Sequence, residues 1–164
     1  MTDTLAGRAV DTAGLRTIAE GVARTAGDWP GLHHPVTRTW HTVAATDRYE
    51  AFVIAWPEGG SIELHDHGDS AGAVVVVAGS LVETSVSHDV DGSLTMRSRV
   101  LGRHDHLEFG PGHVHDLANL GRGPALSVHV YSPVLATMTF FEPRDGSVLV
   151  AVRSEDYRAP GGDR

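Results

Sequence analysis

The chain has 164 residues and contains no cysteine, no lysine and no glutamine, and each absence excludes a kind of chemistry. Without cysteine there can be neither a disulfide framework nor a zinc site built on thiolates. Without lysine there is no Schiff-base chemistry. Arginine, which occurs 13 times, is the only permanent side-chain cation available to an anionic substrate.

Long apolar runs and positive charge are also scarce. No stretch of about eighteen apolar residues occurs, so we expect no membrane span. The N-terminal segment lacks the apolar core of a secretory signal, so we expect a cytoplasmic protein. The formal net charge of −8 offers no basic face to a phosphate backbone. Neither a nucleic acid nor an anionic membrane is therefore expected as a partner.

One helix is predicted near the N-terminus. Leu15, Ile18 and Val22 recur at helical spacing within residues 11–26. Asp11 stands at the start of this pattern and can cap the helix.

After about residue 37, short apolar segments alternate with turns that contain Gly, Pro and Asp, which is typical of an all-β sandwich or barrel. We therefore predict an all-β fold, an antiparallel β-barrel with a short N-terminal helix. The expected parts are a helical segment and connector (1–35), the barrel (36–154) and a frayed tail (155–164). The predicted strands are Thr39–Ala44, Glu50–Ala55, Ser61–His65, Ala73–Ala78, Leu81–Ser87, Leu94–Leu101, His106–Phe109, His115–Asn119, Ala125–Tyr131, Met138–Glu142 and Ser147–Arg153.

A pair of histidines, His65-Asp-His67, lies at the end of a predicted strand. Residues i and i+2 of a strand share a face, so both imidazoles can reach one metal ion inside a barrel. Imidazole suits Fe, Zn, Cu and Ni. A second pair, His104-Asp-His106, shows how easily this spacing arises by chance, so a pair alone does not establish a metal site.

A third histidine follows about fifty residues after this pair and opens another predicted strand. In spacing and order, the residues around the three histidines resemble the two motifs of the cupin superfamily. The resemblance implies a jelly-roll barrel that holds a metal ion on His65, His67 and His115. The matching residues are Gly59, His65, His67 and Gly79 in the first motif, and Pro111, Gly112, His115 and Asn119 in the second.

The remaining histidines are expected outside the site. His113 is the alternative third ligand, but its spacing to Asn119 does not fit the motif. We expect it to face away from His115, at the rim or the surface. His41 is left open, because its strand could line the cavity. Exposure is expected for His33, His34, His88, His104 and His106.

The first cupin motif usually carries a glutamate, and in this chain that position is Gly72. Three neutral imidazoles leave an ion at its full charge with about three open positions. Such an ion can accept a bidentate anionic substrate together with a diatomic molecule. This donor set matches that of the thiol dioxygenases.

Two segments resemble the cysteine dioxygenase family, namely residues 65–72 and Ser127-Val-His129-Val-Tyr131-Ser-Pro133. In mammalian relatives a cysteine at the position of Gly72 is cross-linked to a tyrosine, which is impossible here. The family's matching Ser-Pro bond is cis, so a cis bond before Pro133 is expected.

Ser127, His129 and Tyr131 alternate along one predicted strand and share a face. Alternation alone does not decide between this face and that of Val128 and Val130 for the interior. The family resemblance implies that the three polar residues are catalytic and form a hydrogen-bond relay that ends at the metal site.

A carboxylate anchor is also implied by the family. Arg38, 27 residues before His65, roughly matches the segment that carries the carboxylate-binding arginine of the cysteine enzymes, and Thr42 is the alternative match for that position. Arginine can bind a carboxylate through two parallel hydrogen bonds. The alternative is an arginine that faces solvent, in which case Tyr131 and the metal would bind the substrate.

The hypothesis is an Fe(II)-dependent thiol dioxygenase that adds both atoms of O₂ to the sulfur of a small carboxylate-bearing thiol. L-Cysteine is the leading substrate and mercaptopropionate the alternative, although the glutamine of the mercaptopropionate relatives is missing. A non-catalytic metal-binding or small-molecule-binding cupin and a three-histidine zinc hydrolase are the competing hypotheses. The sequence does not determine the oligomeric state.

Overall fold

The computed structural model describes residues 9–25, 34–145 and 147–157, which form one helix followed by eleven strands. Every predicted element is present, and the ends differ by a few residues. The elements are α1 (Thr12–Ala23), β1 (Thr39–Ala45), β2 (Glu50–Trp56), β3 (Ser61–His65), β4 (Ala71–Ala78), β5 (Leu81–His88), β6 (Leu94–Leu101), β7 (His106–Phe109), β8 (Val114–Ala118), β9 (Ala125–Ser132), β10 (Thr137–Arg144) and β11 (Val148–Asp156).

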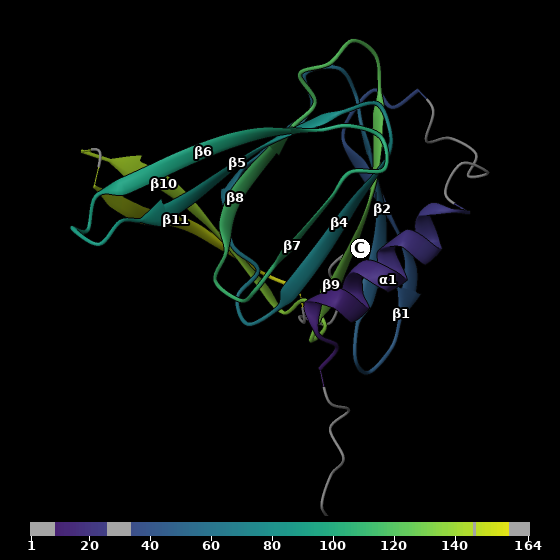
Figure 1. Ribbon diagram of the computed structural model, residues 1–164, viewed down its shortest axis with the longest axis horizontal. Coiled ribbons are helices and arrows are strands. Elements are labelled where there is room, and N and C mark those ends of the chain that lie inside the picture. The colour runs from purple at the N-terminus through teal and green to yellow at the C-terminus, as the bar shows by residue number, and fades with distance from the viewer. Residues whose placement is uncertain (1–8, 26–33, 146, 158–164) are drawn as a thin grey trace, which may run out of the picture.

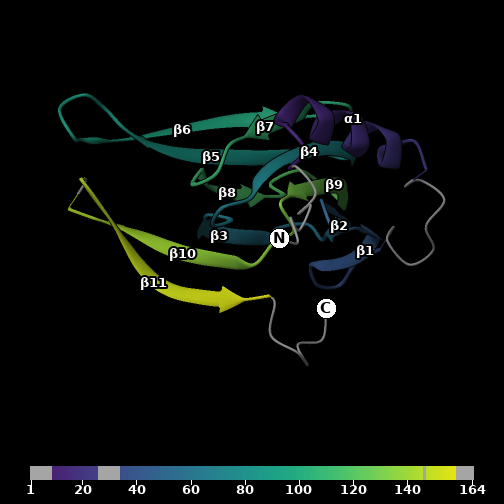
Figure 2. The ribbon, with the colours of Figure 1, turned by 90° about the horizontal axis from the view of Figure 1, so that it is seen from below.

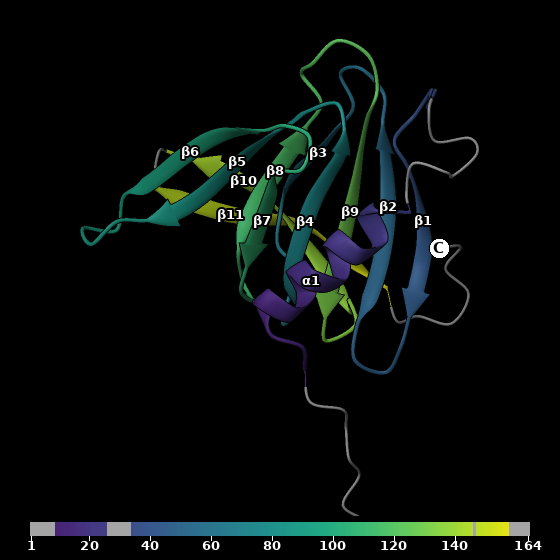
Figure 3. The ribbon, with the colours of Figure 1, turned by 45° about the vertical axis from the view of Figure 1, so that its right-hand side comes forward.

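The strands form two antiparallel sheets that enclose an apolar core. One sheet has five strands in the order β1-β2-β9-β4-β7, which lie side by side in Figure 3. The other has six strands in the order β11-β10-β3-β8-β5-β6. Hairpins β5–β6 and β10–β11 project beyond the rest of the molecule (Figure 1). The prediction of an antiparallel all-β fold with an N-terminal helix is confirmed.

Helix α1 covers the outer face of the five-stranded sheet. The Asp11 side chain accepts a hydrogen bond from the backbone N–H of Gly14 at 2.8 Å, which satisfies one of the unpaired donors at the start of the helix. Leu15 and Ala19 are fully buried against β4 and β9. In Figure 2 the helix lies on one side of the molecule, and β10 and β11 lie on the opposite side. With its twelve residues, α1 is too short to cross a membrane, and no other helix is present among the described residues.

Strand β9 is buried along its whole length because both of its faces are covered. Leu126, Val128 and Val130 belong to the cluster under the helix. The alternate residues of the strand face the space between the sheets, where the candidate site lies. The expected cis bond between Ser132 and Pro133 at the end of β9 is present.

Candidate active site

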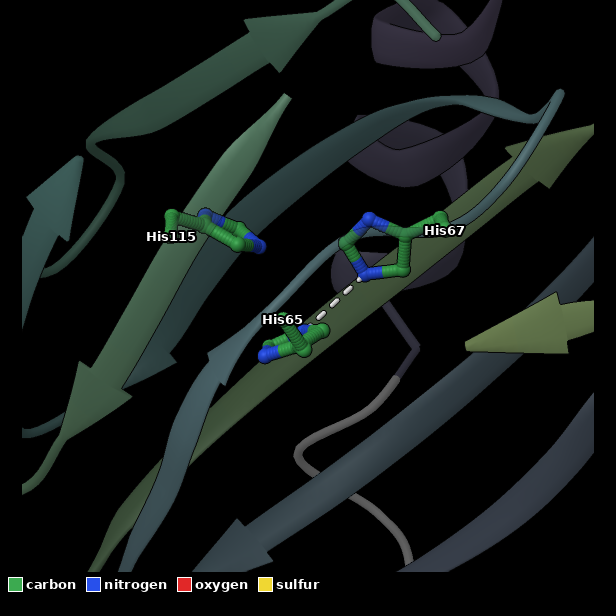
Figure 4. Close-up of side chains that lie close together, drawn as sticks. All are labelled: His65, His67 and His115. Atoms are coloured by element: carbon green, nitrogen blue, oxygen red, sulfur yellow. Dashed lines mark hydrogen bonds between the residues drawn. The ribbon is translucent and has the colours of Figure 1, made fainter. Parts of the chain in front are cut away.

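Three buried histidines meet between the sheets. His65 ends β3 and pairs in register with His115 of β8, while His67 lies in the turn just after β3. The ligand nitrogens of the three lie within 4.8 Å of one another. Figure 4 shows the rings gathered around one point. The predicted convergence of these three imidazoles is confirmed.

Hydrogen bonds at the outer nitrogens fix the tautomers of two of these rings. His65 Nδ1 donates to the carbonyl of Glu63 at 2.7 Å, and His115 Nδ1 donates to Glu83 Oε1 at 3.0 Å. A neutral imidazole carries one proton, so both Nε2 atoms present lone pairs. Nε2 of His67 lies 3.1 Å from Nε2 of His65, and its Nδ1 has no partner among the described residues.

Burial keeps the three rings neutral. Loss of hydration lowers the pKa of His65 to about 3, and it lowers the pKa values of His67 and His115 as well. Each of the three also faces another nearby imidazole, which disfavours a positive charge further. Neutral imidazoles with converging lone pairs are the form that binds a metal ion, so this donor set fits one.

Glu83, a residue that sequence reasoning missed, contacts the histidine cluster from behind His115. Its side chain is almost fully buried, and Oε2 accepts a hydrogen bond from Arg99 Nε at 2.6 Å. Although burial opposes ionisation, hydrogen bonds from His113, His115 and Arg99 hold the pKa of Glu83 well below its usual range. The carboxylate therefore orients the His115 ring from behind, as outer partners of metal-bound histidines do.

The expectation that His113 faces away from His115 was wrong. Their ring centroids are 4.9 Å apart, and His113 Nε2 lies 3.2 Å from Glu83 Oε1. The physical reason is that His113 precedes β8, which begins at Val114. The preceding residue, Gly112, has a φ of +72°, so the backbone turns there and is not extended. Strand alternation therefore does not apply at residue 113. Glu83, His113 and His115 are also close enough to share an ion, but Arg99 already pairs with the carboxylate.

Phe109 occupies the space beside Gly72. The two are register partners on β7 and β4, and a Cβ at Gly72 would clash with the Phe109 ring. Phe109 stacks on His67 with centroids 5.0 Å apart, and it meets His115 edge-on. An aromatic ring over a glycine thus packs against two rings of the histidine cluster.

The polar face of β9 forms the expected chain of hydrogen bonds. Ser127 Oγ lies 2.9 Å from His129 Nε2, and His129 Nδ1 lies 3.2 Å from the Tyr131 hydroxyl. All three side chains are buried. Burial lowers the pKa of His129 and raises that of Tyr131, so the imidazole and the phenol are both neutral. The ring centroids of Tyr131 and His67 are 4.7 Å apart, so the relay ends beside the histidine cluster.

Arg38 lies at the cavity and does not simply face solvent. A cavity of about 410 Å³ is lined by Arg38 together with His65, His129 and Tyr131. The guanidinium carbon lies 5.6 Å from the ring centroid of Trp40 and 5.5 Å from that of Trp56. Burial lowers the arginine pKa. Among the described residues, no carboxylate forms an ion pair with it.

The other histidines lie where the sequence suggested. His41, which was left open, is exposed. His33 lies outside the described residues. The expected exposure is confirmed for His34, His88, His104 and His106.

Two facing antiparallel sheets with histidines between them define the chain as a cupin, and solved structures share this fold. Similarity is found to an oxalate oxidase bound to glycolate (TM-score 0.56, 17% identity, 67% of this chain and 58% of that one). It is also found to the cupin domain of Schizosaccharomyces pombe Cnp3 (TM-score 0.50, 9% identity, 58% and 60%). A Klebsiella pneumoniae protein with a double-stranded β-helix domain matches at TM-score 0.53 and 22% identity (68% and 92%).

The family model for cysteine dioxygenase type I matches residues 1–144. The chain therefore belongs to the cysteine dioxygenase type I family.

Proposed function

We propose that this chain is an iron(II)-dependent thiol dioxygenase that oxidises a small carboxylate-bearing thiol, L-cysteine foremost, to its sulfinic acid. One observation carries the proposal. Three neutral imidazoles converge beside a cavity that also contains Arg38, which has no carboxylate partner among the described residues. Such a cavity offers a metal position and an anion position together. The family assignment supports the same reaction.

In this proposal His65, His67 and His115 hold the metal ion. The orientation of His115 by Glu83 and of His65 by the Glu63 carbonyl suits this role. Nitrogen ligands of this kind suit ferrous iron. A ferrous ion held there would favour the thiolate form of the substrate sulfur and supply the redox chemistry with O₂.

The chain's own groups bind and orient the substrate. Arg38 receives the carboxylate through two parallel hydrogen bonds. Tyr131, held by His129 and Ser127, places its hydroxyl at the wall of the same cavity. Both oxygen atoms of O₂ become bonded to sulfur, and the acid retains the thiol proton. Sulfur supplies the electrons that O₂ gains, so no external reductant is needed.

The test is oxygen uptake by the iron-loaded protein with L-cysteine, 3-mercaptopropionate and cysteamine, with the product identified by mass. We expect sulfinate from L-cysteine, and the least uptake with cysteamine because it lacks a carboxylate. Oxygen uptake with 3-mercaptopropionate alone would move the proposal to that substrate. No sulfinate from any of the three would contradict a thiol dioxygenase and favour a zinc hydrolase or a non-catalytic cupin.

Metal analysis supports the interpretation of that assay. The substitution His65→Ala should abolish iron retention, because two imidazoles rarely hold Fe(II). His88→Ala, which alters an exposed histidine, is the matched control and should retain iron. If both variants retain iron equally, the three-histidine assignment is wrong.

A further inference from the structure

The hydrogen-bond chain on β9 has one more member than the sequence pattern of Ser127, His129 and Tyr131 suggests, and this member lies on another strand. Trp56, at the end of β2, is fully buried, and its indole Nε1 lies 2.8 Å from Ser127 Oγ. The two residues are 71 positions apart in the sequence. The chain of contacts is therefore Trp56, Ser127, His129 and Tyr131, in that order.

The first contact fixes the direction of the second. An indole N–H can only donate, so Ser127 Oγ accepts from Trp56. The serine hydroxyl has a single proton, and His129 Nε2 is the one acceptor for it among the described residues. If Ser127 accepted from both neighbours, its proton would be left unpaired at a site with no solvent exposure, which is costly. Ser127 therefore donates to His129.

The direction then passes along the imidazole to the tyrosine. His129 Nε2 accepts, so the one proton of the neutral ring lies on Nδ1. Nδ1–H donates to the Tyr131 oxygen at 3.2 Å. The phenolic proton of Tyr131 is not used within the chain. It remains available for an acceptor atom in the cavity that Tyr131 lines.

We propose that Trp56 is a positioning residue that fixes the direction of this relay, so that Tyr131 meets the bound ligand as a hydrogen-bond donor. The matching ligand atom is an acceptor with a lone pair, such as a carboxylate oxygen or an oxygen atom that arrives from O₂. The face of the same indole lies beneath the Arg38 guanidinium. One buried ring thus positions both the cation and the phenol at the cavity. The part about catalysis rests on the proposed function, but the direction of the relay does not.

The direct test is the tautomer of His129, measured by nitrogen NMR of the imidazole rings. The full-length chain is used with its metal removed by chelation, because ferrous iron would broaden the signals. The His129 signals are identified by their loss in His129→Gln. We expect the Nδ1–H tautomer in the parent protein. A parent protein with the proton on Nε2 would overturn the proposal without any variant.

The variant test compares two equivalent substitutions. Trp56→Phe removes the indole donor, so Ser127 can donate or accept, and we expect His129 to become a mixture of tautomers. Trp40→Phe removes an indole that also stacks on Arg38 but does not contact Ser127, and it should leave the tautomer unchanged. An unshifted Nδ1–H signal in folded Trp56→Phe would also overturn the proposal.

The catalytic consequence is measured separately on the iron-loaded protein. Loss of one neutral hydrogen bond should lower kcat/KM of Trp56→Phe for L-cysteine by about two- to tenfold. If the tautomer is as expected but no thiol is oxidised, the proposed function fails and the relay direction stands. If the parent carries Nε2–H yet oxidises cysteine, the function stands and the role of Trp56 fails.

Discussion

At the residue scale, Arg38 is held by aromatic rings, with no carboxylate paired to it among the described residues. A guanidinium that stacks on rings keeps its N–H edge available for a planar anion. Trp40 and Trp56 provide these rings. Arg153 also lines the cavity but forms ion pairs with Glu63 and Glu155. The two arginines therefore differ in their capacity to bind a substrate carboxylate.

This difference predicts distinct effects on substrate binding. Arg38→Ala should raise KM for L-cysteine by about one to two decades, because a hydrogen bond to a charged group contributes roughly 1.5–3 kcal/mol. Arg153→Ala is the matched control, and its KM should change far less. Steady-state oxygen uptake measures both. An unchanged KM in Arg38→Ala would assign carboxylate binding to Tyr131 and the metal.

Glu83 is the second residue with a specific expected effect. Glu83→Gln keeps the shape of the side chain but removes the charge that orients His115, and metal affinity should fall by about 10- to 100-fold. Competition with a chelator of known affinity measures the change. Glu108→Gln, at a partly exposed carboxylate paired with Arg16, is the control. Equal affinities in the two variants would rule out the orienting role.

Sequence reasoning found the site residues that lie within recognisable motifs. Motif spacing identified His65, His67 and His115, and the family resemblance chose the polar face of β9 over its apolar face. Glu83, Phe109 and Trp56 reach the site across strands instead. Their roles depend on which strands are neighbours and in which register, as with Gly72 opposite Phe109. No local pattern encodes that register, so these residues were missed.

At the element scale, turn residues and apolar runs predicted all eleven strands, because each short segment carries its own boundaries. The order of strands within the two sheets did not follow from them. Strand β9 pairs with β2 and β4, which lie far from it in the sequence. Eight buried residues in succession would also fit a parallel strand by pattern alone. The helix that covers its outer face explains the pattern.

The pair of β4 and β7 carries a prediction about packing. Gly72→Ala should destabilise the protein by about 1–3 kcal/mol, because the new methyl group meets the Phe109 ring. Adding Phe109→Leu to Gly72→Ala should recover part of this loss, since the smaller side chain leaves room. Urea unfolding followed by tryptophan fluorescence gives the free energies of unfolding for both single variants and the double variant. Strictly additive effects would contradict direct contact between the two positions.

At the scale of the whole molecule, the buried histidines couple stability to pH. Their folded-state pKa values are depressed, as with the value of about 3 for His65, whereas an unfolded histidine titrates near about 6.5. The unfolded chain therefore binds more protons below about pH 6.5. The stability that these buried neutral histidines contribute is fully present above that pH and is lost as the pH falls toward about 3.

We therefore expect the unfolding midpoint of the chelated protein in urea to fall steeply below about pH 6.5. Each buried histidine should contribute a slope of roughly 1.4 kcal/mol per pH unit. His129→Gln should show a shallower slope than the parent, because one titrating group is removed. A midpoint that stays constant between pH 7 and pH 5 would contradict the burial of neutral imidazoles.

The central place of β9, between β2 and β4 and under α1, has a consequence for hydrogen–deuterium exchange. Its amides can exchange only when the core itself opens, so they should be among the slowest in the protein. The edge strand β6, which is mostly exposed, should exchange early. Exchange followed by mass spectrometry of peptides from the two strands measures the difference. The relay of Ser127, His129 and Tyr131 would then persist through every local fluctuation short of global unfolding.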